Sequence, residues 1–332
     1  ALPRCSAAGG PVNIAIDGTG VEDVDTGSAG DMVHIKGSHA DATYDTNGGN
    51  DTVEIDDFGT SAVLNTGSGG DKIELDVELT STNQQIDGGD GSDTLEVSVN
   101  VASGNFDNIE TLEIGGGATA VDLELFDEEL DTVEVETTSD VSLTKIGASH
   151  DIETVNGATV TIVSGTSDQA TFIAAGDLTI ANSSTVTAVE DLDLSFTSNS
   201  ASTLTLTGTA TEKLVIENAD AAVALTGAAI TSAASAVTSI DATALTTALT
   251  VGSAAGSGAG NISAISLGSG NDTAYIDGGQ AGADIDMGDG DDTIDAVVTC
   301  DDKSPSSSSD SLSLLLSSLP TAFSSSVPLS IP

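Results

Sequence analysis

The stretch from Asp87 to Asp93, Asp-Gly-Gly-Asp-Gly-Ser-Asp, constrains the fold of this chain more than any other. Glycine permits backbone turns in which a Cβ would clash. Aspartates in such a turn place hard carboxylate oxygens beside main-chain carbonyl groups, and calcium prefers oxygen ligands of this kind. The strand-like run 94–97 follows, and its aliphatic Leu95 is expected to fix the turn to a core. The stretch therefore predicts a calcium-type turn that leads into a half-buried strand.

The same pattern recurs along the chain at a nearly constant step. Its general form is [D/N/S]-x-[G/N]-x-[G/A]-x-D, usually followed by one residue and then an aliphatic one. The copies span Asp25–Asp31, Asp45–Asp51, Asn65–Asp71, Asp87–Asp93, Ser266–Asp272 and Asp286–Asp292. The closing aspartates are 20, 20 and 22 residues apart in the first group and 20 apart in the second. A looser copy covers residues 279–284. Such a recurrence indicates a repeat architecture.

Each repeat has room for two short strands and two turns. A calcium-type turn is followed by a run such as 52–55 (Thr-Val-Glu-Ile), and a second strand-like run such as 62–64 (Ala-Val-Leu) leads into the next turn. A hairpin fold would need antiparallel turns, and a propeller blade needs about twice the length. The pattern predicts an all-β chain folded as a parallel β-helix or β-roll solenoid, with about 20 residues per coil.

The repeat pattern divides the chain into five regions. Residues 1–11 are expected to be a leader or cap, and residues 12–100 a calcium-binding β-roll array. Residues 101–260 lose the Gly-Asp turns but keep alternating aliphatic and polar runs, which predicts a metal-free β-helix. Residues 261–299 return to the calcium pattern, and 301–332 form a Ser- and Leu-rich tail.

The composition limits the classes of partner. The chain has 53 acidic residues against 6 basic ones, for a formal net charge of -47. Such a surface repels nucleic acid and anionic membranes. Acidic chains are often disordered, but 38% of the residues here are hydrophobic and only 2% aromatic. Aliphatic residues interspersed with threonine and glycine favour strands and tight turns over disorder.

The Gly-Asp repeats resemble those of the RTX (repeats-in-toxin) proteins of bacteria. The fragments 106–112, 239–245 and 265–273 look most like those of RTX-type surface-layer proteins and adhesins. The resemblance implies a right-handed parallel β-helix, calcium between adjacent coils and export by type I secretion. The chain departs from the family in carrying mostly one nonapeptide per coil. Its 301–332 tail also differs from the usual C-terminal secretion signal.

Carried over residue by residue, the resemblance implies a set of calcium ligands. Side-chain oxygens would come from Asp31, Asp51, Asp71, Asp93, Asp272 and Asp292. Main-chain carbonyl oxygens would come from the neighbourhood of Gly89, Gly91, Gly268, Gly270, Gly288 and Gly290. Asp87 and Asp286 open their turns and act as ligands or as caps, and Asp284 closes the looser copy. The alternative is that all of these are ordinary Asx turns.

The sequence predicts no enzyme. His34, His39 and His150 fall in no metal-ligand spacing, so they are expected to be solvated strand or loop residues. A β-helical polysaccharide lyase would need basic groups, which are scarce here. An ice-binding face would need threonine rows in register. Pairs such as Thr159/Thr161 and Thr203/Thr205 hint at such rows, but their spacing in the sequence drifts.

These observations together predict a secreted structural protein. A calcium-loaded solenoid would assemble with copies of itself into a surface layer or similar extracellular lattice or filament. Surplus acids would let calcium bridge neighbouring molecules, and cell-surface polysaccharide is a further candidate partner. The alternative is an RTX adhesin segment, or a calcium-folded binding module of a larger secreted protein.

Overall fold

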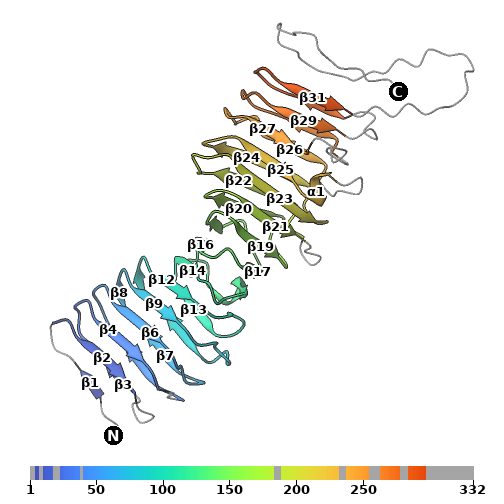
Figure 1. The fold of residues 1–332 in the computed structure, drawn as a ribbon. Coiled ribbons are helices and arrows are strands. Elements are labelled where there is room, and N and C mark those ends of the chain that lie inside the picture. The colour runs from blue at the N-terminus through green and yellow to red at the C-terminus, as the bar shows by residue number, and fades with distance from the viewer. Residues whose placement is uncertain are drawn as a thin grey trace, which may run out of the picture.

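A computed structural model describes residues 4–6, 10–17, 23–37, 40–182, 188–231, 237–253, 262–276 and 283–296. The chain forms an elongated solenoid of parallel strands with roughly 20 residues per turn, which confirms the predicted fold class (Figure 1). Strands β2 and β30 lie at opposite ends of the molecule. Among the described residues, no helix is long and apolar enough to cross a membrane.

One continuous sheet runs the length of the solenoid. This sheet, called sheet B, has 14 parallel strands, and each described coil contributes one. At about 4.8 Å per strand it is roughly 60 Å long. Its strands are β2 (Asn13–Ile16), β4 (Met32–Ile35), β6 (Thr52–Ile55), β9 (Lys72–Leu75), β12 (Thr94–Val97), β14 (Thr111–Ile114), β16 (Thr132–Val135), β18 (Asp151–Thr154), β20 (Gln169–Ala174), β22 (Asp191–Phe196), β24 (Lys213–Ala219), β26 (Ser239–Asp241), β28 (Ala264–Ser266) and β30 (Asp284–Asp286).

A second sheet accompanies sheet B only in the N-terminal part. Sheet A has six parallel strands, and each comes just before a sheet B strand in the chain. They are β1 (Arg4–Ser6), β3 (Asp23–Asp25), β5 (Thr43–Asp45), β7 (Val63–Asn65), β10 (Gln85–Asp87) and β13 (Asn105–Asp107). Two Gly-Asp turns also pair directly, through the short strands β8 (Ser68–Gly69) and β11 (Asp90–Gly91).

Sheet D replaces sheet A in the rest of the solenoid. Its nine parallel strands each come after a sheet B strand in the chain. They are β15 (Ala120–Asp122), β17 (Asp140–Thr144), β19 (Ala158–Ile162), β21 (Leu178–Asn182), β23 (Ser202–Gly208), β25 (Val223–Thr226), β27 (Leu249–Val251), β29 (Thr273–Ile276) and β31 (Thr293–Ala296). A 3₁₀ turn, η1 (Leu123–Leu125), and a single helical turn, α1 (Ala228–Thr231), interrupt the strands.

The core is a column of aliphatic side chains between the sheets. Strands such as β6, β9 and β12 alternate partly buried and fully buried positions, so their aliphatic residues face inward. This period of two is what a strand with one buried face requires. Stacking in register places each aliphatic residue on its counterpart one coil away, as in Val53↔Ile73.

The change from sheet A to sheet D occurs within residues 101–126. In this stretch two isolated bridges connect successive coils, one on the side of sheet D (Val101↔Val121) and one on the side of sheet A (Phe106↔Phe126). The rings of Phe106 and Phe126 stack with centroids 4.6 Å apart. This coil therefore belongs to both parts of the solenoid and joins them without breaking sheet B.

Because of the change from sheet A to sheet D, the Gly-Asp turns of the two arrays lie at different ends of the sheet B strands. In the first array each turn leads from sheet A into sheet B, as residues 46–51 do between β5 and β6. In the second array each turn leads out of sheet B into sheet D, as residues 267–272 do between β28 and β29. The two arrays therefore lie at opposite ends of the sheet B strands, in addition to lying at opposite ends of the solenoid.

Candidate functional site: rows of stacked carboxylates

The closing aspartates of the first array form a continuous row inside the turn corner. The backbone amide of Asp31 donates to Oδ1 of Asp51 at 2.7 Å, and that of Asp51 donates to Oδ1 of Asp71 at 2.7 Å. The amide of Asp71 donates to Oδ1 of Asp93, also at 2.7 Å. The row begins at the amide of Val12, which donates to Asp31. Each carboxylate thus connects its own coil to the preceding one.

The second oxygen of most of these carboxylates has no hydrogen-bond partner among the described residues. This holds for Oδ2 of Asp51, Asp71 and Asp93, whose side chains are at most 2% exposed. Asp31 differs, because its Oδ2 accepts from the amide of Gly27 at 3.2 Å. A buried carboxylate oxygen without a donor is costly. These atoms therefore identify places where a proton or a cation is needed.

Burial changes the acidity of the row. It raises the pKa of Asp51 and Asp71, and the amides that donate to these carboxylates oppose the shift. The Thr46 hydroxyl also lowers the pKa of Asp51. Its own hydrogen bond, however, is donated to the carbonyl oxygen of Thr66 at 2.9 Å. Burial raises the pKa of Asp93 to about 6, with further contributions from the facing carboxylates of Asp71, Glu110 and Asp87.

The glycines allow the turns to stack at backbone distance. A Cβ at Gly69 would lie 1.7 Å from the carbonyl oxygen of Gly49, and one at Gly91 would lie 1.5 Å from that of Gly69. A Cβ at Gly89 would lie 1.9 Å from the carbonyl oxygen of Gly67. That Gly67 oxygen accepts from the amide of Asp90 at 2.7 Å, so the turns are also joined by backbone hydrogen bonds.

The residues that open the turns form a second, outer row. Asp25, Asp45, Asn65, Asp87 and Asp107 stand in register at the ends of the sheet A strands. Burial raises the pKa of Asp45, and the charges of Asp25 and Asp23 raise it further. Oδ1 of Asp87 accepts from the Gly89 amide at 3.0 Å and from the Asn108 side-chain amide at 2.7 Å. Asp87 therefore caps its turn, one of the two roles expected for it.

The second array repeats the inner row over a shorter span. The amide of Asp272 donates to Oδ1 of Asp292 at 2.9 Å, and the amide of Leu249 donates to Oδ1 of Asp272 at 2.7 Å. Asp272 is 1% exposed, and its Oδ2 lacks a hydrogen-bond partner among the described residues. Asp286 is the register partner of Ser266 in the opening row, and its Oδ1 caps the amide of Gly288 at 3.1 Å.

The glycines of this array are packed as tightly as those of the first. A Cβ on any of them would lie 1.8 to 2.3 Å from a carbonyl oxygen of the preceding coil: Gly268 (Leu245), Gly270 (Thr247), Gly288 (Gly268) and Gly290 (Gly270). The carbonyl of Gly268 also accepts from the amide of Asp289 at 3.0 Å. Stacking therefore engages part of the carbonyl set that the sequence assigns to the metal.

The structure does not bring Asp284 into the row. Asp284 is the first residue of β30 and pairs in register with Ala264. It therefore lies at the opposite end of this strand from Asp286 and the turn that follows. Residues 279–282 of the looser copy lie outside the described part of the chain.

Sequence reasoning missed a member of the inner row, Glu110. The pairing of Thr94 with Thr111 places Glu110 in register with Asp93, and its Oε2 accepts from the Asp93 amide at 2.6 Å. The signal was present, because Glu110-Thr111-Leu112 parallels Asp93-Thr94-Leu95. The absence of glycines before Glu110 concealed it.

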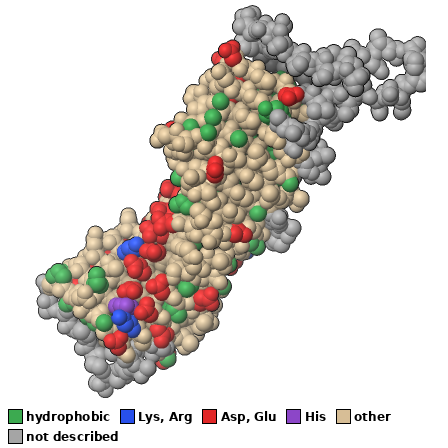
Figure 2. All heavy atoms as spheres, in the orientation of Figure 1, with side chains coloured by type: hydrophobic (Ala, Val, Ile, Leu, Met, Phe, Trp, Pro, Cys, Tyr) green, Lys and Arg blue, Asp and Glu red, His purple; other side chains and the backbone are tan. Residues whose placement is uncertain are grey.

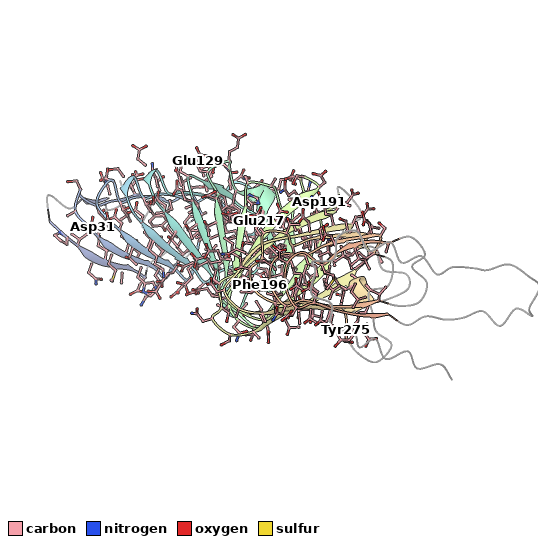
Figure 3. The ribbon with its side chains drawn as sticks, turned by 90° about the horizontal axis from the view of Figure 1, so that it is seen from above. Asp31, Glu129, Asp191, Phe196, Glu217 and Tyr275 are labelled. Carbon is pink, nitrogen blue, oxygen red and sulfur yellow. The ribbon has the colours of Figure 1, made fainter. Side chains whose placement is uncertain are left out.

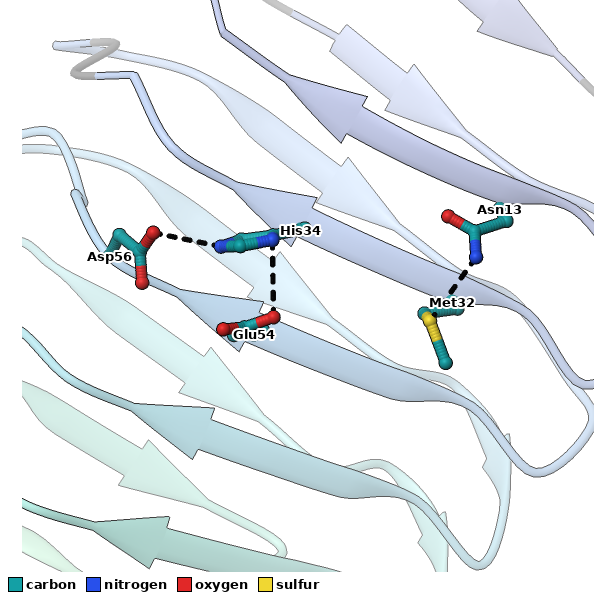
Figure 4. Close-up of polar contacts among 5 residues, drawn as sticks. All are labelled: Asn13, Met32, His34, Glu54 and Asp56. Carbon is teal, nitrogen blue, oxygen red and sulfur yellow. Dashed lines mark hydrogen bonds and ion pairs between the residues drawn. The ribbon is translucent and has the colours of Figure 1, made fainter.

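His34 was expected to be a solvated residue without metal-ligand spacing, but stacking brings it to two carboxylates (Figure 4). Its Nδ1 lies 3.1 Å from an oxygen of Glu54, and its Nε2 lies 2.8 Å from one of Asp56. The three side chains come close enough to hold a metal ion. However, each ring nitrogen already contacts a carboxylate, and a metal would have to replace one of these contacts.

The prediction for His150 was wrong. His150 is 9% exposed, and its Nδ1 accepts from the amide of Gly147 at 3.1 Å. Burial lowers the pKa of His150, and the Asp131 carboxylate opposes this shift. His150 precedes β18 at the register position that the exposed Asp131 occupies before β16. His39 lies outside the described residues.

A column of glutamates also runs along the outer face of sheet B. Its members stand in register on successive strands: Glu54, Glu74, Glu96, Glu113, Glu134 and Glu153. Lys72 is placed among them, with Nζ 2.8 Å from Glu96 and 3.5 Å from Glu113. Burial raises the pKa of Glu134, as do the neighbouring charges of Glu113 and Glu153. On the face shown in Figure 2, acidic side chains gather over the N-terminal half.

The chemistry of the inner rows fits a hard cation. Among the described residues they offer buried carboxylate oxygens without donors, and they lie beside glycine turns that pack against carbonyl oxygens of the preceding coil. Calcium takes six to eight such oxygens. The residues that would hold it are Asp51, Asp71 and Asp93 in the first array and Asp272 in the second.

Comparisons with known proteins add no identification: no family model, no curated protein and no solved structure matches the chain.

Proposed function

We propose that this protein is a secreted structural protein whose Gly-Asp coils bind calcium and need it to fold. The observation that carries the proposal is the inner row. Asp51, Asp71 and Asp93 each use one oxygen for stacking and leave the other buried, with no donor among the described residues. Calcium between the turns would supply the missing positive charge. The same chemistry applies to the second array through Asp272, whose Oδ1 accepts from the Leu249 amide and whose Oδ2 is buried without a partner among the described residues.

The expected stabilisation is large enough to control folding. Extracellular calcium modules bind with dissociation constants of about 0.1–1 mM. A site at tenfold saturation stabilises the folded state by about 1.4 kcal/mol. A few such sites together approach the whole net stability of a domain, which is about 5–15 kcal/mol. Calcium concentration would therefore set whether the arrays are folded.

The outer acids support a role in assembly. The glutamate column and the opening row of aspartates place like charges in register on neighbouring strands, with few bases to balance them. Calcium bound between molecules would relieve this repulsion. We therefore propose that copies of the chain associate through calcium into an extracellular lattice or filament, with cell-surface polysaccharide as a further candidate partner.

A calcium titration tests both parts of the proposal. Circular dichroism in excess EGTA should show reduced β signal, which calcium at about 1 mM restores. Negative-stain microscopy of the same samples should show sheets or filaments only with calcium. An unchanged β signal in EGTA would contradict calcium-dependent folding. Particles that fold with calcium but stay monomeric would contradict assembly and favour an adhesin segment or a binding module.

A further inference from the structure

A row of threonines accompanies the inner aspartates of the first array. Thr26, Thr46 and Thr66 each follow the opening residue, and their side chains are buried. Each hydroxyl donates to a carbonyl oxygen of the next coil: Thr26 to Thr46 at 3.0 Å, Thr46 to Thr66 at 2.9 Å, and Thr66 to Gly88 at 2.7 Å. We call the contact between two successive coils at this position a junction. At each of these three junctions, the threonine hydroxyl donates a hydrogen bond to one main-chain oxygen.

The row ends at Gly88, which has the same backbone position but no hydroxyl. The amide of Gly88 donates to the carbonyl of Asp107 at 3.0 Å, as the amide of Thr66 does to that of Asp87 at 2.9 Å. The next acceptor in the row is the carbonyl oxygen of Asn108. It accepts no hydrogen bond within the described part of the chain.

Two oxygens without donors converge beside Gly88. A Cβ on Gly88 would lie 2.1 Å from the carbonyl oxygen of Asn108 and 2.9 Å from Oδ2 of Asp93. These two distances place the oxygens no more than 5.0 Å apart. Calcium bonds oxygens at about 2.3–2.6 Å, so one ion can bridge a pair separated by up to about 5 Å. Asp93 is fully buried, and its Oδ2 has no hydrogen-bond partner among the residues that the structure describes.

A further carboxylate comes from the coil that lacks the Gly-Asp pattern. Glu110 occupies the register position of a closing aspartate, and its Oε2 lies 2.6 Å from the Asp93 amide. We propose that Asp93, Glu110 and the carbonyl oxygen of Asn108 form a separate site for a hard divalent cation at the end of the first array. It deepens the proposed function, since it rests on calcium binding by the array. It adds a ligand from outside the repeats.

The geometry distinguishes this junction from those before it. At the junctions of Thr26, Thr46 and Thr66, a hydroxyl donates to the carbonyl and the facing carboxylate comes from an aspartate of the repeat. At the Gly88 junction there is no hydroxyl, and the facing carboxylate is that of Glu110, which accepts from the Asp93 amide. Oxygen acceptors gather there without a donor, which is the arrangement that a divalent cation completes.

Calcium titration of the full chain by isothermal calorimetry tests the site. Glu110→Gln keeps an oxygen that can accept from the Asp93 amide but removes the charge. It should bind one calcium ion fewer than the wild type and keep the rest. The matched control is Glu217→Gln, an exposed glutamate on β24, six sheet B strands beyond β12, which should leave the number of bound ions unchanged (Figure 3). Glu110→Asp retains a carboxylate and should retain the site, with affinity weakened at least about tenfold because the shorter side chain reaches less well.

Three results would overturn the proposal. Equal stoichiometry for Glu110→Gln and Glu217→Gln would show that no ion depends on Glu110. Loss of several ions from Glu110→Gln would place Glu110 in the folding of the whole array instead of in one site. If the wild type itself binds no calcium, the proposed function fails together with the site, and this result is distinct from the first two.

Discussion

The Gly-Asp coils of residues 23–97 and the middle coils of residues 132–226 share one sheet but close their corners differently. In the first array the corner is closed by buried carboxylates that leave one oxygen without a donor. In the middle, a neutral side chain closes one such corner. Asn182, fully buried, donates through Nδ2 to the Val189 carbonyl and to the Thr211 hydroxyl, both at 2.7 Å. The described middle coils thus offer a corner stacked by neutral groups, whereas the corners of the first array bury carboxylates.

The outer faces differ in the same way. The glutamate column of sheet B runs through the first array and ends in the first two middle coils, at Glu134 and Glu153, whereas sheet D in the middle presents a column of threonines, Thr159, Thr179, Thr205 and Thr226. These threonines are unevenly spaced in the sequence, yet turns of different length bring them into register. Charge that needs a counterion is thus concentrated in the N-terminal half, as Figure 2 shows for one face.

The largest expected effect comes from filling the space between two Gly-Asp turns. In Gly69→Ala the new Cβ would lie 1.7 Å from the carbonyl oxygen of Gly49, at a residue whose φ of +144° already favours glycine. We expect a loss of at least about 3 kcal/mol in the free energy of unfolding. Gly116→Ala is the control, because no atom lies within 4 Å of its Cβ, and it should change stability by less than about 0.5 kcal/mol. Chemical denaturation in calcium measures both, and equal stabilities would contradict the stacked geometry.

A buried charge placed in the middle coils should be costly whatever the calcium concentration. Asn182→Asp removes the donor to Val189 and Thr211 and puts a carboxylate in a fully buried position. We expect destabilisation of about 3 kcal/mol or more, because the charge has no cation to pair with. Thermal unfolding in EGTA and in calcium should show similar losses. Rescue by calcium would contradict the assignment of the middle as metal-free.

Replacing a buried aspartate of the array by asparagine should change stability in opposite directions with and without calcium. Asp71→Asn keeps an oxygen for the Asp51 amide but removes the buried charge. In calcium the variant should lose about 1–2 kcal/mol, because one ligand is lost. In EGTA it should be more stable than the wild type, because a neutral amide is easier to bury than a carboxylate. The same sign in both conditions would contradict a metal role for Asp71.

The smallest effect concerns the glutamate column. Burial and the charges of Glu113 and Glu153 raise the pKa of Glu134 in the folded state, so folding favours its protonated form. Its contribution to stability is then present at low pH and is lost as pH rises through the folded-state pKa. Glu134→Gln mimics the protonated form and should stabilise by about 0.2–1 kcal/mol at pH 7. Urea denaturation should show no gain at pH 3, and a gain of the same size there would contradict the explanation.

The sequence predicts the solenoid well because its two strongest signals are local. The 20-residue step of closing aspartates and the alternation in runs such as Thr52–Ile55 both survive in the structure. The sequence does not predict whether the turns of an array lie at the beginning or at the end of the sheet B strands. A Gly-Asp turn looks the same whether it enters or leaves a sheet, and the difference is set by the pairing around Phe106 and Phe126.

Individual site residues were less predictable where register decides their surroundings. Glu110 joins the inner row because Thr111 pairs with Thr94, a relation that no nearby residue reveals. Stacking likewise brings His34 to Glu54 and Asp56 across coil boundaries. Asp284 matched the repeat only loosely in the sequence, and register separates it from the other aspartates.

Hydrogen exchange of the intact chain, with and without EGTA, tests most directly whether the two kinds of coil differ in their need for calcium. We predict that chelation exposes the backbone amides of Asp51 and Asp71, which donate to carboxylates in the array. Amides in the middle coils, such as those of β19 to β23, should stay protected. Equal protection of the array in EGTA and in calcium, or loss of protection in both regions together, would contradict this account.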